Sequence, residues 1–280
     1  MNLMHKLMWI VVACFMMLFV NSAYSQETDS RGNVVQDAAK IPEYALRLIA
    51  AYPEQHLRFA DNHIIFEDDT AMIYDDGKHK DFEQALDDSD IEDMFLMEYS
   101  RSGEPQYLQD AGRSRCESFF KKMYGKDAKS VKKNLVNVLW FGENIKFTRI
   151  NGAADQLKQV AAEIQQAHPE VIPYMKSSGT FVWRKVRGAN RQSSHSYGIA
   201  IDIAVKQSDY WRWGYPKAHE TDEIRYKNRI PMEIVKVFEK YGFVWGGRWY
   251  HYDTMHFEYR PEIVYQKVES QVTGTDYNNR

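Results

Sequence analysis

Residues 193–205 read SSHSYGIAIDIAV and place one carboxylate inside an apolar, strand-like run. Because successive side chains of a strand point to opposite faces, Ile201, Ile203 and Val205 would share one face. Asp202 would then lie on the other face, flanked by two alanines. A buried carboxylate costs free energy unless it is paired or coordinates a metal. We therefore expect a partner for Asp202 elsewhere in the chain.

One candidate partner, His195, stands seven residues before Asp202, and Gly198 lies between them. A fully extended chain would separate the two side chains by more than ~20 Å and turn them to opposite faces. Glycine adopts turn conformations at little cost, so Gly198 lets the chain fold back and bring His195 beside Asp202. The stretch therefore predicts half of a metal site.

The second half of the site is predicted from HYDTMHFEYRPE, which begins at residue 251. His256 and Glu258 would share one strand face, and Asp253 precedes His256 by three residues, beside an expected bend. Two histidines and one aspartate, with water as a fourth ligand, form an open catalytic Zn²⁺ site, and a further carboxylate can act as a base. Each histidine could instead lie alone in a turn or in the core, but the two motifs together favour the metal site.

The combined motifs, SxHxxGxAxD at 193–202 and DxxHFE at 253–258, resemble those of the zinc D-alanyl-D-alanine carboxypeptidase-like peptidases. These VanY-like enzymes cut peptidoglycan peptides. The preceding GTFVWRKVRGANRQSSH at 179–195 also resembles this family, and the resemblance covers roughly residues 150–265. It implies an α+β fold in which helices flank a small antiparallel sheet that carries the zinc site, as in hedgehog and DD-peptidase domains.

The resemblance also implies a role for each residue of the motifs. His195, Asp202 and His256 would bind Zn²⁺, and Asp253 would be the general base. Asp253 would take a proton from the attacking water and return it to the leaving amine. An arginine would polarise the scissile carbonyl and stabilise the oxyanion.

The arginine with this role is predicted less sharply than the metal ligands. Arg184 is the candidate, and Arg187 and Arg191 are close rivals. Each of the three could instead be a surface cation or bind a substrate carboxylate. Glu258 would either orient the free imidazole N–H of a ligand or form a salt bridge with Arg260.

The pattern of apolar, glycine and proline residues predicts a helix-rich first part and a mixed α+β second part. We expect four segments: a signal peptide (1–25), a helix-rich N-terminal region with a β-hairpin (26–130), a zinc peptidase core (131–266) and a polar tail (267–280). Helices are expected within residues 41–53, 81–99, 112–125, 152–167 and 231–242, a β-hairpin within 63–77, and β-structure within 129–150.

The first residues are typical of a cleavable signal peptide. The apolar run at 7–20 is shorter than the ~20 residues of a spanning helix, and small residues, Ala23 and Ser25, follow it at the spacing of a cleavage site. We expect cleavage after Ser25, a periplasmic or secreted protein, and no membrane span after cleavage. An uncleaved anchor is the alternative.

Composition and the remaining reactive side chains narrow the function further. The net charge of −3 gives no reason to expect nucleic acid as a partner. Cleavage would leave 280 − 25 = 255 residues with a single cysteine, Cys116, and hence no internal disulfide. Near Phe119 and Phe120, Cys116 is expected to be a buried structural thiol. His219 and His251 lie close to the motifs in the sequence but have no partner motif.

These observations predict an exported zinc metallopeptidase that hydrolyses peptidoglycan stem peptides, most simply a D-alanyl-D-alanine carboxypeptidase, with muropeptide as its partner. One alternative is an endopeptidase that cuts an interior bond such as L-Ala–D-Glu. Another is a non-catalytic, zinc-stabilised cell-wall-binding module. Asp253 argues against the module, because a binding protein needs no base beside its metal.

Overall fold

The computed structural model describes residues 41–264 of the chain. The predicted signal peptide and polar tail lie outside the described residues. Helices and small antiparallel sheets make up the described range, so the α+β class is confirmed. None of its helices is both long and apolar enough to cross a membrane.

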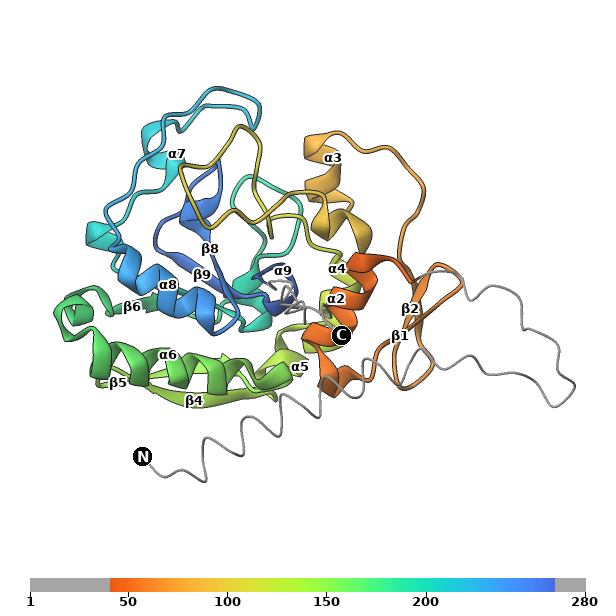
Figure 1. Ribbon diagram of the computed structural model, residues 1–280, viewed down its shortest axis with the longest axis horizontal. Helices are drawn as coiled ribbons and strands as arrows, with labels where there is room; N and C mark the ends of the chain where they lie inside the picture. The colour runs from red at the N-terminus through yellow and green to blue at the C-terminus, as the bar shows by residue number, and fades with distance from the viewer. Residues whose placement is uncertain (1–40, 265–280) are drawn as a thin grey trace, which may run out of the picture. The chain divides into compact units, whose positions relative to one another are not determined.

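The α-helices of this range, all labelled in Figure 1, are α2 (Glu43–Ala51), α3 (Phe82–Asp87), α4 (Glu117–Tyr124), α5 (Ala128–Lys132), α6 (Ala153–Ala167), α7 (Trp211–Gly214), α8 (Met232–Lys240) and α9 (Pro261–Val264). The strands are β1 (Arg58–Ala60), β2 (His63–Ile65), β3 (Ala71–Ile73), β4 (Leu135–Trp140), β5 (Glu143–Thr148), β6 (Ser177–Gly179), β7 (Ala200–Ile203), β8 (Phe243–Trp245) and β9 (His256–Tyr259). They form three antiparallel sheets, ordered β1-β2-β3, β4-β5 and β6-β7-β9-β8.

The four-stranded sheet carries both sequence motifs on its two inner strands, β7 and β9. In their antiparallel register Asp202 lies opposite His256, and Ile201 lies opposite Phe257. Ile201 and Phe257 are fully buried, and the Phe257 ring stacks on Phe238 of α8 with ring centroids 4.0 Å apart. One face of the sheet is therefore core, which leaves the opposite face for the ionisable side chains.

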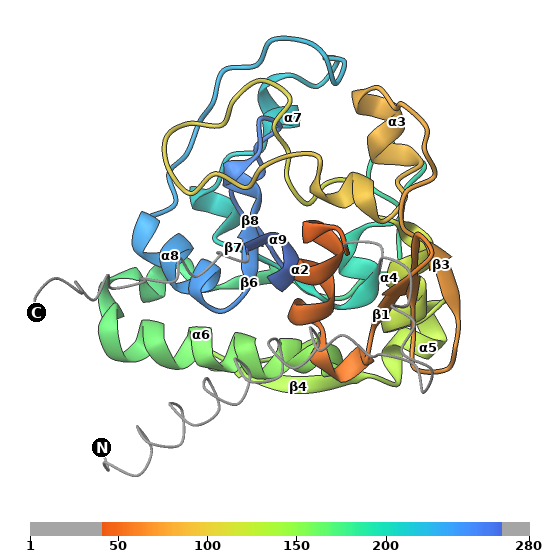
Figure 2. The ribbon, with the colours of Figure 1, turned by 45° about the vertical axis from the view of Figure 1, so that its right-hand side comes forward.

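Residues 109–115, which precede α4, lie against the same sheet. The backbone carbonyl of Ala111 accepts a hydrogen bond from Nε1 of Trp249 (2.7 Å), and that of Gly112 accepts one from Nη1 of Arg260 (2.7 Å). Figures 1 and 2 both show this yellow-green segment close to the blue strands. These contacts join the predicted N-terminal region to the predicted catalytic core.

Most of the expected elements are confirmed. Helices within residues 41–53, 152–167 and 231–242 are α2, α6 and α8. The hairpin within 63–77 is β2–β3, to which β1 adds a third strand, and the β-structure within 129–150 is the β4–β5 hairpin.

The helix expected within 81–99 is interrupted. It ends at Asp87, and a separate 3₁₀ turn follows at Glu92–Phe95. The side chain of Asp90 accepts a hydrogen bond from the backbone N–H of Asp93, and the side chain of Asp93 accepts one from that of Asp90. This reciprocal capping starts a new turn where the sequence pattern predicted continuation.

The helix expected within 112–125 is shorter than predicted, because α4 begins only at Glu117. It ends before Gly125, as expected. Cys116 lies at its start and is buried, as predicted, and burial raises the pKa of its thiol.

The strand β7 also ends earlier than its alternation predicts. Ala204 has a left-handed backbone (φ 53°), and its carbonyl accepts a hydrogen bond from Oγ of Ser208. Val205 therefore lies in a 3₁₀ turn and is 36% exposed, so its expected place on the face of Ile203 was wrong.

Candidate metal centre

A tight turn places His195 at the start of β7. His195 lies in a 3₁₀ turn (Ser194–Tyr197), and Gly198 follows with φ +68°. This left-handed backbone favours glycine, and a Cβ atom at Gly198 would in addition displace Cδ2 of Leu135, which would lie 2.5 Å away. The expected fold-back at Gly198 is confirmed.

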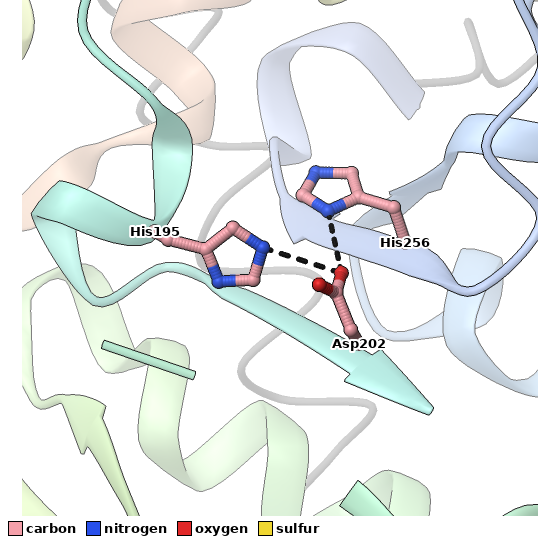
Figure 3. A group of neighbouring side chains, drawn as sticks. All are labelled: His195, Asp202 and His256. Carbon is pink, nitrogen blue, oxygen red and sulfur yellow. Dashed lines mark hydrogen bonds and ion pairs between the residues drawn. The ribbon is translucent and has the colours of Figure 1, made fainter. Parts of the chain in front are cut away.

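The sheet brings together the three predicted ligands. Oδ1 of Asp202 lies 3.2 Å from Nε2 of His195 and 2.9 Å from Nδ1 of His256 (Figure 3). One potential ligand atom from each residue lies within 4.8 Å of those from the others. Asp202 and His256 meet because they are cross-strand partners, whereas His195 arrives through the turn at Gly198.

The outer nitrogen of each imidazole is held by a hydrogen-bond acceptor. Nδ1 of His195 lies 2.8 Å from the carbonyl oxygen of Thr180, and Nε2 of His256 lies 3.2 Å from Oε2 of Glu258. When these nitrogens carry the proton, the inner nitrogens beside Asp202 are free to bind a cation. Two imidazoles and a carboxylate with oriented outer nitrogens fit Zn²⁺.

The electrostatics of the cluster favour positive charge at its centre. Burial alone would raise the pKa of Asp202, but His195 and His256 hold it well below its ordinary value. Burial would lower the pKa of His256, but hydrogen bonds to Asp202 and Glu258 raise it to about 10. A bound divalent cation would likewise compensate the negative charge of Asp202.

Glu258 takes both of the roles that the sequence left as alternatives. Its Oε2 faces His256, and its Oε1 accepts a hydrogen bond from Nη1 of Arg260 at 3.0 Å. Nη1 of Arg115 lies 3.5 Å from Oε2. Although burial opposes ionisation, Arg115 and His256 hold the pKa of Glu258 far below its ordinary value.

Asp253 lines the same cavity as the three candidate ligands. Its Oδ1 is buried and forms no hydrogen bond with the described residues. Burial, reinforced by the negative charge of Asp202, raises the pKa of Asp253 to about 7. A carboxyl group with this pKa can both accept and release a proton near neutral pH.

The three candidate arginines lie around this cavity, whose volume is 480 Å³. Arg184 is exposed, and its positive charge acts on Asp253. Arg187 is exposed and forms no ion pair with any residue of 41–264. Arg191 pairs with Asp87 of α3, so its charge is largely compensated.

Two further arginines of the cavity wall, Arg113 and Arg115, were missed by sequence reasoning. They belong to the segment before α4, where the pattern predicted a helix, and nothing in their spacing pointed to the motifs. Burial lowers the pKa of Arg115 to about 10. Their side chains come to the site only through the packing of this segment against the sheet.

A second cluster adjoins the cavity and was also missed. Asp110, Glu220 and His251 offer ligand atoms within 4.8 Å of one another, and Nδ1 of His251 lies 2.5 Å from Oδ2 of Asp110. Arg113 bridges the two carboxylates, with 2.5 Å to Oδ2 of Asp110 and 2.9 Å to Oε2 of Glu220. The guanidinium therefore takes the place that a metal cation would need. His219 lies in neither cluster.

An α+β sheet that gathers two histidines, an aspartate and a further buried carboxyl in one cavity has the layout of a metallohydrolase centre. A family model described as D-alanyl-D-alanine carboxypeptidase matches residues 187–259. The matched stretch contains His195, Asp202, His256 and Asp253, but not Arg184.

This match confirms the family resemblance that the two motifs indicated, and it supports a peptidase that acts on peptidoglycan. No curated protein and no solved structure matches the chain significantly.

Proposed function

We propose that the protein is an exported zinc metallopeptidase that hydrolyses peptidoglycan stem peptides, most simply as a D-alanyl-D-alanine carboxypeptidase. One observation carries the proposal: the three candidate ligands and Asp253 line a single cavity, within the stretch that matches the family. Export rests on the predicted signal peptide at residues 1–25, with cleavage after Ser25.

Each residue of the cavity has a separate task in this reaction. Nε2 of His195, the Asp202 carboxylate and Nδ1 of His256 would hold Zn²⁺, which supplies Lewis-acid polarisation of the scissile carbonyl. Asp253 takes a proton from the attacking water and returns it to the leaving amine, which its pKa of about 7 suits. Arg184 stabilises the negative charge that develops on the carbonyl oxygen.

The charge of the cavity supports a substrate with a free carboxylate close to the scissile bond. Only two carboxylates line it, Asp202 and Asp253. Six cations line it: Arg113, Arg115, Arg184, Lys185, Arg187 and Arg191. Arg113, Arg115 and Arg191 pair with acidic side chains outside the lining, so the excess of positive charge comes from the other three.

Three of these cations have no acidic partner among the described residues: Arg184, Lys185 and Arg187. Arg184 is assigned to the carbonyl oxygen and Arg187 also borders a neighbouring cavity, so Lys185 is the candidate that binds the C-terminal carboxylate of the substrate.

A stem pentapeptide with a free or an amidated C-terminus tests this proposal. We expect loss of the terminal D-Ala, observed by mass spectrometry, and cleavage of the amidated peptide about tenfold more slowly, since a charge-assisted hydrogen bond is lost. Lys185→Met should abolish the difference between the two peptides. Lys146→Met is the matched control, because Lys146 is exposed on β5 and does not line the cavity. Equal rates on both peptides, or a cut at an interior bond, would favour the endopeptidase.

A further inference from the structure

A second cavity, of 470 Å³, adjoins the metal cavity. This second cavity is lined by α3, by the loop around residues 187–191 and by residues 210–220. Four residues line both cavities: Arg187, Arg191, Tyr210 and Trp213. The two cavities are therefore adjacent, and a substrate too long for the metal cavity could extend toward the second one.

Trp213, which lines both cavities, has a solvent-exposed indole ring. Its side chain belongs to the short helix α7, and the residue is 55% exposed. The ring of Tyr210 lies perpendicular to it, with centroids 6.1 Å apart, which fixes an edge of the tryptophan and leaves the rest accessible. An exposed tryptophan beside a cavity is an apolar surface that a ligand can cover.

The charges of the second cavity differ from those of the metal cavity. Its four cations, Arg187, Arg191, Arg212 and Lys217, face three carboxylates, Glu83, Asp87 and Glu220. Two of these cations are already paired, Arg191 with Asp87 and Arg212 with Glu220. The wall therefore offers hydrogen-bond donors and acceptors in near balance, which suits a neutral ligand with many hydroxyl groups better than an anion.

We propose that the second cavity is a subsite for a sugar unit of the substrate, with Trp213 as its stacking surface. A sugar ring presents a C–H face to an aromatic ring and a rim of hydroxyl groups to charged side chains. The inference rests on the proposed function, because in a muropeptide the stem peptide is joined to a sugar. The peptide then occupies the metal cavity while the sugar occupies the second one.

The test compares one stem peptide in two forms, free and joined to its sugar, on Trp213→Ala. Loss of an aromatic contact should raise KM for the sugar-linked peptide by about three- to tenfold and leave kcat unchanged. KM for the free peptide should rise by less, because that peptide meets Trp213 only where the residue borders the metal cavity. Trp213→Phe keeps an aromatic face and should lose less. Leu139→Ala is the matched control, because Leu139 is 68% exposed on β4 and lines neither cavity.

Each other outcome overturns the inference in a distinguishable way. An unchanged KM for the sugar-linked peptide in both Trp213 variants would show that Trp213 does not contact the substrate. An equal rise in KM for both peptides would show that Trp213 contacts the peptide and not the sugar. Unmodified protein that cleaves neither form would overturn the proposed function together with this inference.

Discussion

Two neighbouring clusters combine histidine with carboxylates, and they differ in what compensates the negative charge. Around Asp202, the described residues supply two imidazoles and no lysine or arginine in direct contact. Around Asp110, the guanidinium of Arg113 already bridges to Glu220. A set of potential ligand residues is thus a candidate metal site only where no lysine or arginine already compensates the negative charge of its carboxylates.

Replacement of a proposed zinc ligand should show the largest difference between the two clusters, in zinc content. His256→Ala should abolish stoichiometric zinc and activity, because it removes one of three protein ligands. His195→Ala and Asp202→Ala should do the same. His251→Ala alters the Arg113-bridged cluster and should keep zinc, as measured by elemental analysis. Full zinc content in His256→Ala would contradict this assignment.

Replacement of Asp253 should lower the catalytic rate and leave the zinc content unchanged. Asp253→Ala should keep zinc and lower kcat by roughly two to four orders of magnitude, the usual contribution of a positioned acid–base group. A pH profile of the unmodified protein should show activity falling on the acid side, because protonated Asp253 cannot accept a proton. Burial raises the pKa of this carboxyl, and a bound divalent cation opposes that rise. Loss of zinc in Asp253→Ala would make Asp253 a ligand, and unchanged activity would move the base to another carboxylate.

Asp110 should contribute to the stability of the fold more than to the catalytic rate. Burial alone would raise its pKa, but Arg113 and His251 lower it to about 2, below the unfolded value of about 3.9. Asp110 therefore stabilises the fold above about pH 4, and this contribution is lost as pH falls toward 2.

Replacement of this buried carboxylate tests the same point at neutral pH. Asp110→Asn should lower the free energy of unfolding by about 2–4 kcal/mol, measured by urea denaturation, since it leaves Arg113 without one partner. Zinc content should not change. Stability equal to that of the unmodified protein at pH 7 would mean that the Arg113 network is not stabilising.

The sequence predicted that His195, Asp202 and His256 lie together, and part of this geometry is set locally. Gly198 and the alternation of β7 bring His195 and Asp202 together within a few residues. The partnership of Asp202 with His256 needs the register of two distant strands. The residue types of the two motifs indicated it, and the family resemblance then implied the ligand roles.

The Asp110 cluster could not be predicted in this way. Its members Asp110, Glu220 and His251 come from three irregular segments far apart in the sequence, and no period or motif connects them. The early end of α3 was missed for a related reason, because the mutual capping of Asp90 and Asp93 outweighs the helical pattern of the segment.

The most direct test of the central claim follows a purified stem pentapeptide by mass spectrometry with three preparations of the protein: as purified, after chelation, and after chelation with Zn²⁺ restored. We predict release of the terminal D-Ala by the first preparation, none by the second and full recovery in the third. Cleavage that continues after complete removal of the metal, or no cleavage by zinc-loaded protein, would contradict a zinc peptidase centred on His195, Asp202 and His256.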